Sequence, residues 1–172
     1  MNYTTENPKG IDDQIQTIQN YLYSKLGWSD LELFGRVFKN RRKASKTTIP
    51  EAYIGKGEYR EVLTNDKVNA IMFFVDDDEH TSQQGFTFKT KINLVVIANL
   101  KKIYANTDYR EDLQCIQEVV ELLQKSGKQV LKIKKGVKAS LNEFYHEDIA
   151  FSNMEPYTCF SLEFEISYQL DC

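Results

Sequence analysis

Hydrophobic residues recur at two spacings along this 172-residue chain, and each spacing predicts a different kind of element. Between positions 11 and 26, an isoleucine or leucine returns every three or four residues, which predicts an amphipathic helix that ends at Gly27. Between positions 86 and 98, apolar and polar residues alternate, and positions 160–170 alternate in the same way. Alternation of this length predicts two strands, each with one buried face. The residues on the two predicted apolar faces are Phe86, Phe88, Ile92, Leu94 and Val96 in the first strand, and Phe160, Leu162, Phe164, Ile166, Tyr168 and Leu170 in the second.

Shorter patterns fill the rest of the chain. They predict short strands near 31–37, 52–55 and 59–63 and a strand in the apolar run 70–75. Asp108 to Glu111 has the spacing of a capping box, which predicts a second helix that closes at Gly127. The residues that this helix is predicted to bury are Leu113, Ile116, Val119, Val120 and Leu123. After it, a basic segment at 131–138 leads to a short helix or irregular loop at 140–145.

The order of these elements indicates an α+β fold. We expect an antiparallel sheet with a long β-hairpin, packed on one face by the two helices, because the long alternating strands have one polar face. The strands 86–98 and 160–170 are predicted to belong to this one sheet. Residues 1–9 are polar and contain Pro8, so they are expected to form a flexible N-terminal arm. Residues 10–172 are then a single α+β domain.

Composition narrows the class of protein. Hydrophobic residues make up 41% of the chain, enough for a core, and a net charge of −3 does not suggest a general nucleic-acid binder. The longest apolar run, 92–100, is far shorter than the roughly 18 residues of a membrane span. The N-terminus does not resemble a signal peptide, and the three cysteines lack C-x-x-C spacing. We therefore expect synthesis in a reducing cytoplasm and no membrane association.

The stretch FFVDDDEHTSQQGF, residues 73–86, contains four consecutive acids followed by His80. The acids are Asp76, Asp77, Asp78 and Glu79. Such side chains can bind metal, but adjacent strand residues point to opposite faces and do not converge. The spacing also departs from a calcium loop, because Thr81 stands where glycine is required. The flanking apolar strands favour the alternative, an exposed acidic tip of a long hairpin, so we predict no specific metal.

A second charged stretch is basic throughout. Its cationic residues are Lys39, Arg41, Arg42, Lys43 and Lys46. Three interpretations remain open for it: a solvated loop, a contact with phosphates, or a contact with an acidic loop of another subunit.

Residue types suited to catalysis are few. Nothing in the sequence supports a Cys–His pair with either histidine, His80 or His146, and Cys115 lies among apolar helix positions. The segment GKGEYRE, residues 55–61, matches neither a Walker A loop nor a dinucleotide fingerprint. Glu163 and Glu165 share the polar face of the last strand, where solvation explains them. We predict that the chain is not an enzyme and holds no cofactor.

Three longer segments carry a further pattern. The chain begins with the helix IDDQIQTIQNYLYSKL, and its middle is a hairpin strand that leads into the second helix, INLVVIANLKKIYANTDYREDLQCIQEVVELLQK. It ends with a Pro–Tyr turn and an alternating strand, NMEPYTCFSLEFEISYQLDC. Together these segments resemble tailed-phage neck and tail-terminator ring proteins, also called tail-completion proteins. The frequent Asn, Lys, Ile and Tyr are similar to the residue usage of crAss-like phages of AT-rich gut bacteria.

The resemblance implies a structural virion protein that is made in the host cytoplasm and forms a ring at the head–tail junction, either as the neck or as the tail terminator. Six or twelve copies would enclose a channel for DNA and contact neighbouring head–tail or tail ring proteins. The two charged stretches, 39–46 and 76–79, would then be subunit or DNA contacts. Two rival classes remain. One is a small cytosolic α+β enzyme or ligand-binding domain, which a deep pocket lined by Tyr145, His146 and Glu147 would favour; the other is an adaptor of a contractile injection system.

Overall fold

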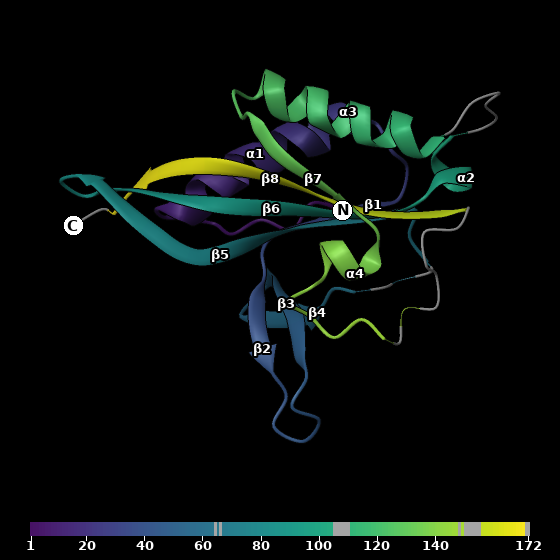
Figure 1. Cartoon of the computed structure of the whole chain (residues 1–172), viewed down its shortest axis with the longest axis horizontal. Helices are drawn as coiled ribbons and strands as arrows, with labels where there is room; N and C mark the ends of the chain where they lie inside the picture. Colours follow the sequence, from purple (N-terminus) through teal and green to yellow (C-terminus); the bar gives the residue numbers. More distant parts are fainter. Residues whose placement is uncertain (64, 66, 105–110, 148, 150–155, 171–172) are drawn as a thin grey trace.

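The computed structural model describes residues 1–63, 65, 67–104, 111–147, 149 and 156–170, which contain four helices and eight strands (Figure 1). The α+β class predicted from the sequence is confirmed. The elements in chain order are α1 (Ile11–Leu26), β1 (Leu31–Arg36), β2 (Phe38–Arg41), β3 (Thr48–Gly55), β4 (Glu58–Glu61), β5 (Ala70–Gln84), β6 (Thr87–Asn99), α2 (Leu100–Ile103), α3 (Glu111–Lys125), β7 (Val130–Lys135), α4 (Val137–Ser140) and β8 (Tyr157–Gln169).

The strands form a five-stranded sheet in the order β1-β5-β6-β8-β7 and a three-stranded sheet in the order β2-β3-β4. The strands β6 and β8 pair antiparallel along their whole length, which confirms that positions 86–98 and 160–170 share one sheet. The predicted antiparallel pairing holds for β5, β6, β8 and β7, but the large sheet is mixed, because β1 and β5 run parallel. After β1 the chain leaves to build the small sheet and returns to the start of β5, so both strands run in the same direction.

One face of the large sheet is covered by α1 and α3, as predicted (Figure 1). The buried stripe of α3 contains Cys115, Ile116, Val119 and Leu123. The prediction that Leu113 is buried is wrong: two residues before Cys115, it lies about 200° around the helix and is exposed. The proposed capping residue Asp108 lies outside the described residues.

The other face is also covered, which corrects the prediction of packing on one face only. The small sheet and α4 lie against it (Figure 1), and together they form a second apolar cluster with the large sheet. Phe73 and Val75 of β5 and Val95 and Ile97 of β6 point into this cluster. Their neighbours Met72, Phe74, Leu94 and Val96 point into the first one. The runs are therefore continuously apolar because both of their faces are buried.

The N-terminal segment is docked, in contrast to the flexible arm expected for residues 1–9. Asn2 forms a parallel bridge with Leu33, and the Tyr3 amide donates to the Leu33 carbonyl at 2.9 Å. The Gln19 side chain of α1 donates to the Tyr3 carbonyl at 2.7 Å. These contacts extend the sheet by one short segment and cover the outer edge of β1.

Candidate functional site

The sequence predicted that the four acids form the tip of the hairpin, and this prediction is wrong. The pairing of β5 with β6 continues past them to Gln84↔Thr87, and the turn lies at Gly85 and Phe86. The acids instead occupy an irregularity in β5, where the register breaks between Asp76 and His80. A bulge of this kind re-aims side chains within a strand. Asp78 takes up the change with a left-handed backbone, at φ 60°.

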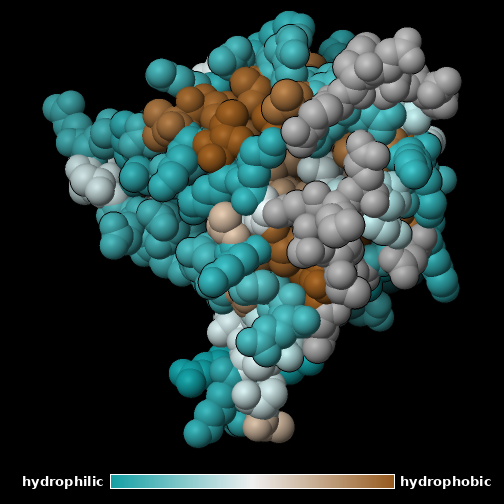
Figure 2. Space-filling view, turned by 45° about the vertical axis from the view of Figure 1, so that its right-hand side comes forward, coloured by the Kyte–Doolittle hydropathy of each residue, from teal (hydrophilic) through white to brown (hydrophobic). Residues whose placement is uncertain are grey.

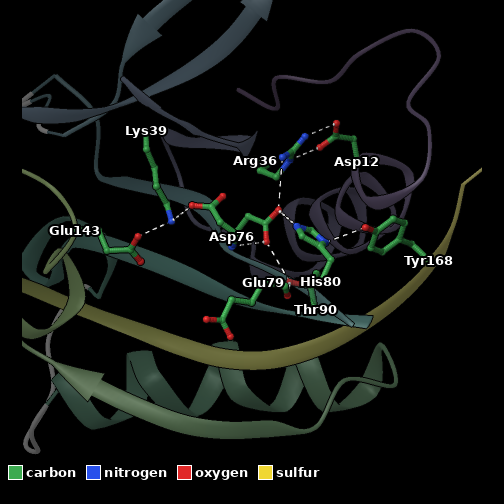
Figure 3. Close-up of polar contacts among 10 residues, drawn as sticks. Asp12, Arg36, Lys39, Asp76, Glu79, His80, Thr90, Glu143 and Tyr168 are labelled. Atoms are coloured by element: carbon green, nitrogen blue, oxygen red, sulfur yellow. Dashed lines mark hydrogen bonds and ion pairs between the residues drawn. The ribbon is translucent and has the colours of Figure 1, made fainter. Parts of the chain in front are cut away.

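Asp76 is buried, with 3% exposure, although the sequence predicts an exposed acid. Its Oδ1 accepts hydrogen bonds from the Thr90 hydroxyl and from the Asp78 amide, both at 3.2 Å (Figure 3). Its Oδ2 lies 3.3 Å from His80 Nε2 and 3.6 Å from Arg36 Nη1. A buried carboxylate requires such partners, and here they come from β1, β5 and β6.

Arg36 extends this cluster to the first turn of α1. Its Nε and Nη2 donate to the two carboxylate oxygens of Asp12, at 2.8 and 3.1 Å. The hydrogen bond to Asp12 raises the pKa of Arg36, and the charge of Asp76 adds to the effect. Bidentate pairing fixes direction as well as distance. Arg36 therefore links β1 and α1 to the base of the hairpin.

On the other side, His80 Nδ1 lies 2.8 Å from the hydroxyl of Tyr168 in β8. A hydroxyl next to an imidazole that faces a carboxylate is the arrangement used to activate a nucleophile. Tyr168 is poorly suited to that role, because burial and the charge of Asp76 raise the pKa of its hydroxyl. It therefore keeps its proton near neutral pH. The contacts shown here connect four strands and α1, and their effect is to fix the hairpin where it leaves the core.

The structure brings only one residue of the basic stretch to the acids. Lys39 Nζ lies 2.6 Å from Asp78 Oδ2 and also pairs with Glu143 (Figure 3). Hydrogen bonding to these two carboxylates outweighs partial burial and raises the pKa of Lys39. Arg42 pairs instead with Glu61, across the small sheet. The exposed cations Arg41, Lys43 and Lys46 lie at the end of the β2–β3 hairpin.

A feature missed in the sequence lies on the face of the large sheet opposite α1. In β6 and β8, Lys89 Nζ lies 2.6 Å from Glu165 Oε2, and Lys91 Nζ lies 3.9 Å from Glu163 Oε1. Lys132 of β7 is in register with Glu163, so it lies on the same face. The polar positions of 86–98 and 160–170 already carry opposite charges, and this was the available signal. We call this arrangement the charge ladder.

Two hollows flank the start of α1. A pocket of about 190 Å³ lies between α1, the N-terminal segment and the small sheet. Phe38, Tyr53 and Tyr59 line it, in edge-to-face contacts at 5.4 and 5.5 Å. A shallower hollow of about 330 Å³ is lined by Asp13, Tyr168 and neighbours. Neither is lined by Tyr145, His146 or Glu147, the residues at which a deep pocket would favour a small enzyme or ligand-binding domain.

The cysteines of the described region are part of the core, as predicted for Cys115. Burial raises the pKa of the Cys115 and Cys159 thiols to about 12, so neither is a thiolate near neutral pH. Within the described ranges, no three His, Cys, Asp or Glu side chains come together in a way that could hold a metal ion. None of the described helices has the length and apolar character of a membrane span.

No family model matches the chain, and comparison with curated proteins and with solved structures found no match either.

Proposed function

We propose that this chain is a structural virion protein whose copies form a ring at the head–tail junction, either as the neck or as the tail terminator. DNA passes through the channel of the ring, and neighbouring head–tail or tail rings contact its faces. The proposal extends the family resemblance of the three sequence segments, and the shape of the β5–β6 hairpin supports it.

The observation that carries the proposal is the projecting half of this hairpin. Residues 70–76 of β5 are buried, whereas the following eight, Asp77–Gln84, are all exposed. The end of the β5–β6 hairpin extends past the helices that cover the sheet (Figure 1). At the base of this segment, Asp76 contacts Arg36, Thr90 and His80. These contacts hold the segment in one orientation, which a loop exposed only to solvent does not require. A structure that must meet a neighbour at a fixed angle does need them, because ordering a segment before binding lowers the entropy lost in the interface.

The β2–β3 hairpin is the second projection, and it points in another direction (Figure 1). Its end carries Arg41, Lys43 and Lys46, all exposed. In a ring, a cationic hairpin of this kind suits either the phosphates of DNA in the channel or the acidic surface of an adjacent ring. Lys39 and Asp78 form an ion pair within one chain, so we do not include this pair among the contacts between subunits.

The test is mass spectrometry and electron cryomicroscopy of phage particles purified by density gradient. We expect the chain in every tailed particle, at a fixed copy number of six or twelve. Particles assembled with the triple variant Arg41→Glu, Lys43→Glu and Lys46→Glu should lose infectivity. Charge reversal of the exposed Lys25 and Lys101 should leave infectivity unchanged. Absence of the chain from purified, infectious particles would rule out the proposal.

One observation favours a second candidate, a ligand-binding domain. The pocket lined by Phe38, Tyr53 and Tyr59 is partly apolar, and Arg36 and Asp12 stand at its wall. Small-molecule sites have this mixture of aromatic surface and few polar groups, although they are usually larger. Screening a fragment library by NMR would test it: shifts confined to the pocket that disappear in Tyr59→Ala would support it, and shifts spread over the surface would not.

A further inference from the structure

The charge ladder changes sign from one strand to the next. On the face opposite α1, β8 contributes Glu163 and Glu165, and β6 contributes Lys89 and Lys91, in ion pairs with those glutamates. At one end of the ladder, β7 adds cations: Lys132 and Lys134 are in register with Glu163 and Ser161. Opposite charges on neighbouring strands stabilise a sheet, and like charges destabilise it.

At the other end of the ladder, β5 adds acids. Thr81 of β5 is in register with Lys89, so Glu79, two positions earlier, lies on the same face as Thr81. Its side chain extends away from the Asp76 cluster (Figure 3). The exposed Asp77 precedes it in the chain. Across β7, β8, β6 and β5, the sequence of charges is therefore positive, negative, positive and negative.

Both ends of the ladder are open edges. Among the described strands, none pairs with the outer side of β7, and β1 accompanies β5 only as far as Phe74. The remainder of β5, Asp77–Gln84, has β6 on one side and no described strand on the other. We call this segment the open arm. The outer edge of β1, in contrast, is covered by the N-terminal bridge at Asn2.

We propose that the open arm of one copy pairs, strand to strand, with β7 of the next copy. This inference rests on the proposed ring and names the contact that closes it. The acids Asp77 and Glu79 would then lie beside the cations Lys132 and Lys134, and the alternation of sign would continue from copy to copy. Within the described residues these four side chains have no ion-pair partner of their own, so they are available to a neighbour.

Strand direction fits the same arrangement. The pairs β5–β6, β6–β8 and β8–β7 are all antiparallel. It follows that β7 runs opposite to β5, so copies related by rotation along the sheet bring the two open edges together antiparallel. The interface is head-to-tail, with a different surface on each side, which is the type of interface that closes into rings.

The two edges differ in height along the strands. Val130 of β7 is level with Asp76 of β5, through Phe164 and Ile92, whereas the open arm begins only after Asp76. Lys132 and Lys134 are level with Val75 and Phe73 of β5, so they meet Glu79 and Asp77 of a neighbour only if the copies are shifted along the strand direction by about four residues, roughly 13 Å at ~3.3 Å per residue. A closed ring accommodates such a shift if its strands are inclined to the ring axis, as in barrels.

The apolar surface of β7 supports an interface at this edge. Leu131 and Ile133 are 47% and 46% exposed. In Figure 2, hydrophobic groups gather in the upper part of the view, where α3 and β7 lie, and the projecting hairpin at the left is almost wholly hydrophilic. Lysines on an edge strand usually prevent it from pairing with the strands of other molecules. A strand with acidic residues is an exception, because its charges are opposite to those of the lysines.

The test uses two charge-reversed variants of the full chain. The arm variant carries Asp77→Lys and Glu79→Lys, and the edge variant carries Lys132→Glu and Lys134→Glu. Sedimentation velocity at rising concentration measures self-association of the parent, of each variant, and of their equimolar mixture. We expect each variant alone to associate at least about tenfold more weakly than the parent, because like charges would face each other. The mixture should regain association, since each variant then meets an opposite charge on the other.

The matched control carries Lys25→Glu and Lys101→Glu, which gives the same change in net charge as the edge variant at two exposed sites elsewhere. It should associate like the parent. The inference is overturned if the parent remains monomeric up to its solubility limit, if both variants associate like the parent, or if the mixture is no better than either variant. The ring itself is decided separately, by the presence of the chain in particles, so its failure and the failure of this contact are distinguishable.

Discussion

The strands β5, β6 and β8 each run through two environments, and the contrast between their halves explains the molecule. In the half around Leu94 and Phe164, side chains on both faces are buried, under α1 and α3 on one side and under α4 and the small sheet on the other. In the half that contains the open arm, the residues of β5 are all exposed and the face opposite α1 carries the lysines and glutamates of the charge ladder, whereas Ile166 and Tyr168 of β8 stay buried on the α1 face. The pairing of β5 with β6 therefore continues after β5 has left the core, and the outer edge of the open arm is exposed to a neighbouring molecule.

The boundary between these halves lies at Asp76. It is the last buried residue of β5, and its partners Arg36, Thr90 and His80 come from the elements around it. A hairpin that leaves its core without support is only marginally stable in water. The Asp76 cluster, together with the pairing of β6 with β8, provides this support.

The largest difference between the halves should appear when an acid replaces a phenylalanine. Phe164 is fully buried, and Phe164→Asp places a charge in the core, which costs several kcal/mol and unfolds a marginal domain. Phe86, at the tip of the hairpin, is 65% exposed, and Phe86→Asp should change the free energy of unfolding by less than about 0.5 kcal/mol. Urea denaturation followed by circular dichroism measures both. Equal stability of the two variants would show that the division is wrong.

A smaller effect is expected at the boundary. Asp76→Asn removes the charge that faces Arg36 and His80 and should lower the free energy of unfolding by about 1–3 kcal/mol. Asp78→Asn, two residues away, disrupts an exposed pair with Lys39 and should cost less than about 1 kcal/mol. Thermal melts at neutral pH compare the two variants. If Asp78→Asn proved the more harmful, Asp76 would not be the anchor of the hairpin.

The smallest expected change in the free energy of unfolding concerns Tyr104, and it depends on alkaline pH. Burial raises the pKa of Tyr104, whose hydroxyl donates to Glu118 Oε2 at 2.9 Å. A tyrosine whose folded pKa lies above its unfolded value of about 10 contributes stability that is fully present below pH 10 and is lost as the pH rises above it. Tyr104→Phe should cost about 1 kcal/mol at pH 7, through the lost hydrogen bond, and should lose less stability between pH 10 and 11 than the parent. An identical decline in both proteins would contradict the burial of this hydroxyl.

Sequence patterns predicted the buried half better than the projecting one. Periodicity located α1, β6 and β8, because burial of one face imposes it. The continuous apolar runs in β5 and β6 also signalled burial on both faces, but the predicted fold had no layer for the second face. The parallel pairing of β1 with β5 depends on how the chain returns from the small sheet, which no local pattern encodes.

The site was harder to predict, because its contacts join residues distant in the chain. Arg36, Asp76 and Tyr168 meet only after folding, and nothing near Asp76 in the sequence distinguishes it from the exposed Asp77. The charge ladder was different. Its lysines and glutamates occupy alternating positions of the two strands, so an antiparallel alignment of the two sequences places opposite charges side by side.

The most direct test of the central claim, that copies join through the open arm and β7, is zero-length cross-linking of carboxylates to lysines. The protein is a mixture of ¹⁴N-labelled and ¹⁵N-labelled chains, so that hybrid masses identify links between copies. Links of Lys39 to Asp78 and of Lys89 to Glu165 should appear within single chains, as internal controls. The account predicts hybrid links of Asp77 or Glu79 to Lys132 or Lys134. Detection of the internal links, with no hybrid link between the open arm and β7 in the assembled protein, would contradict it.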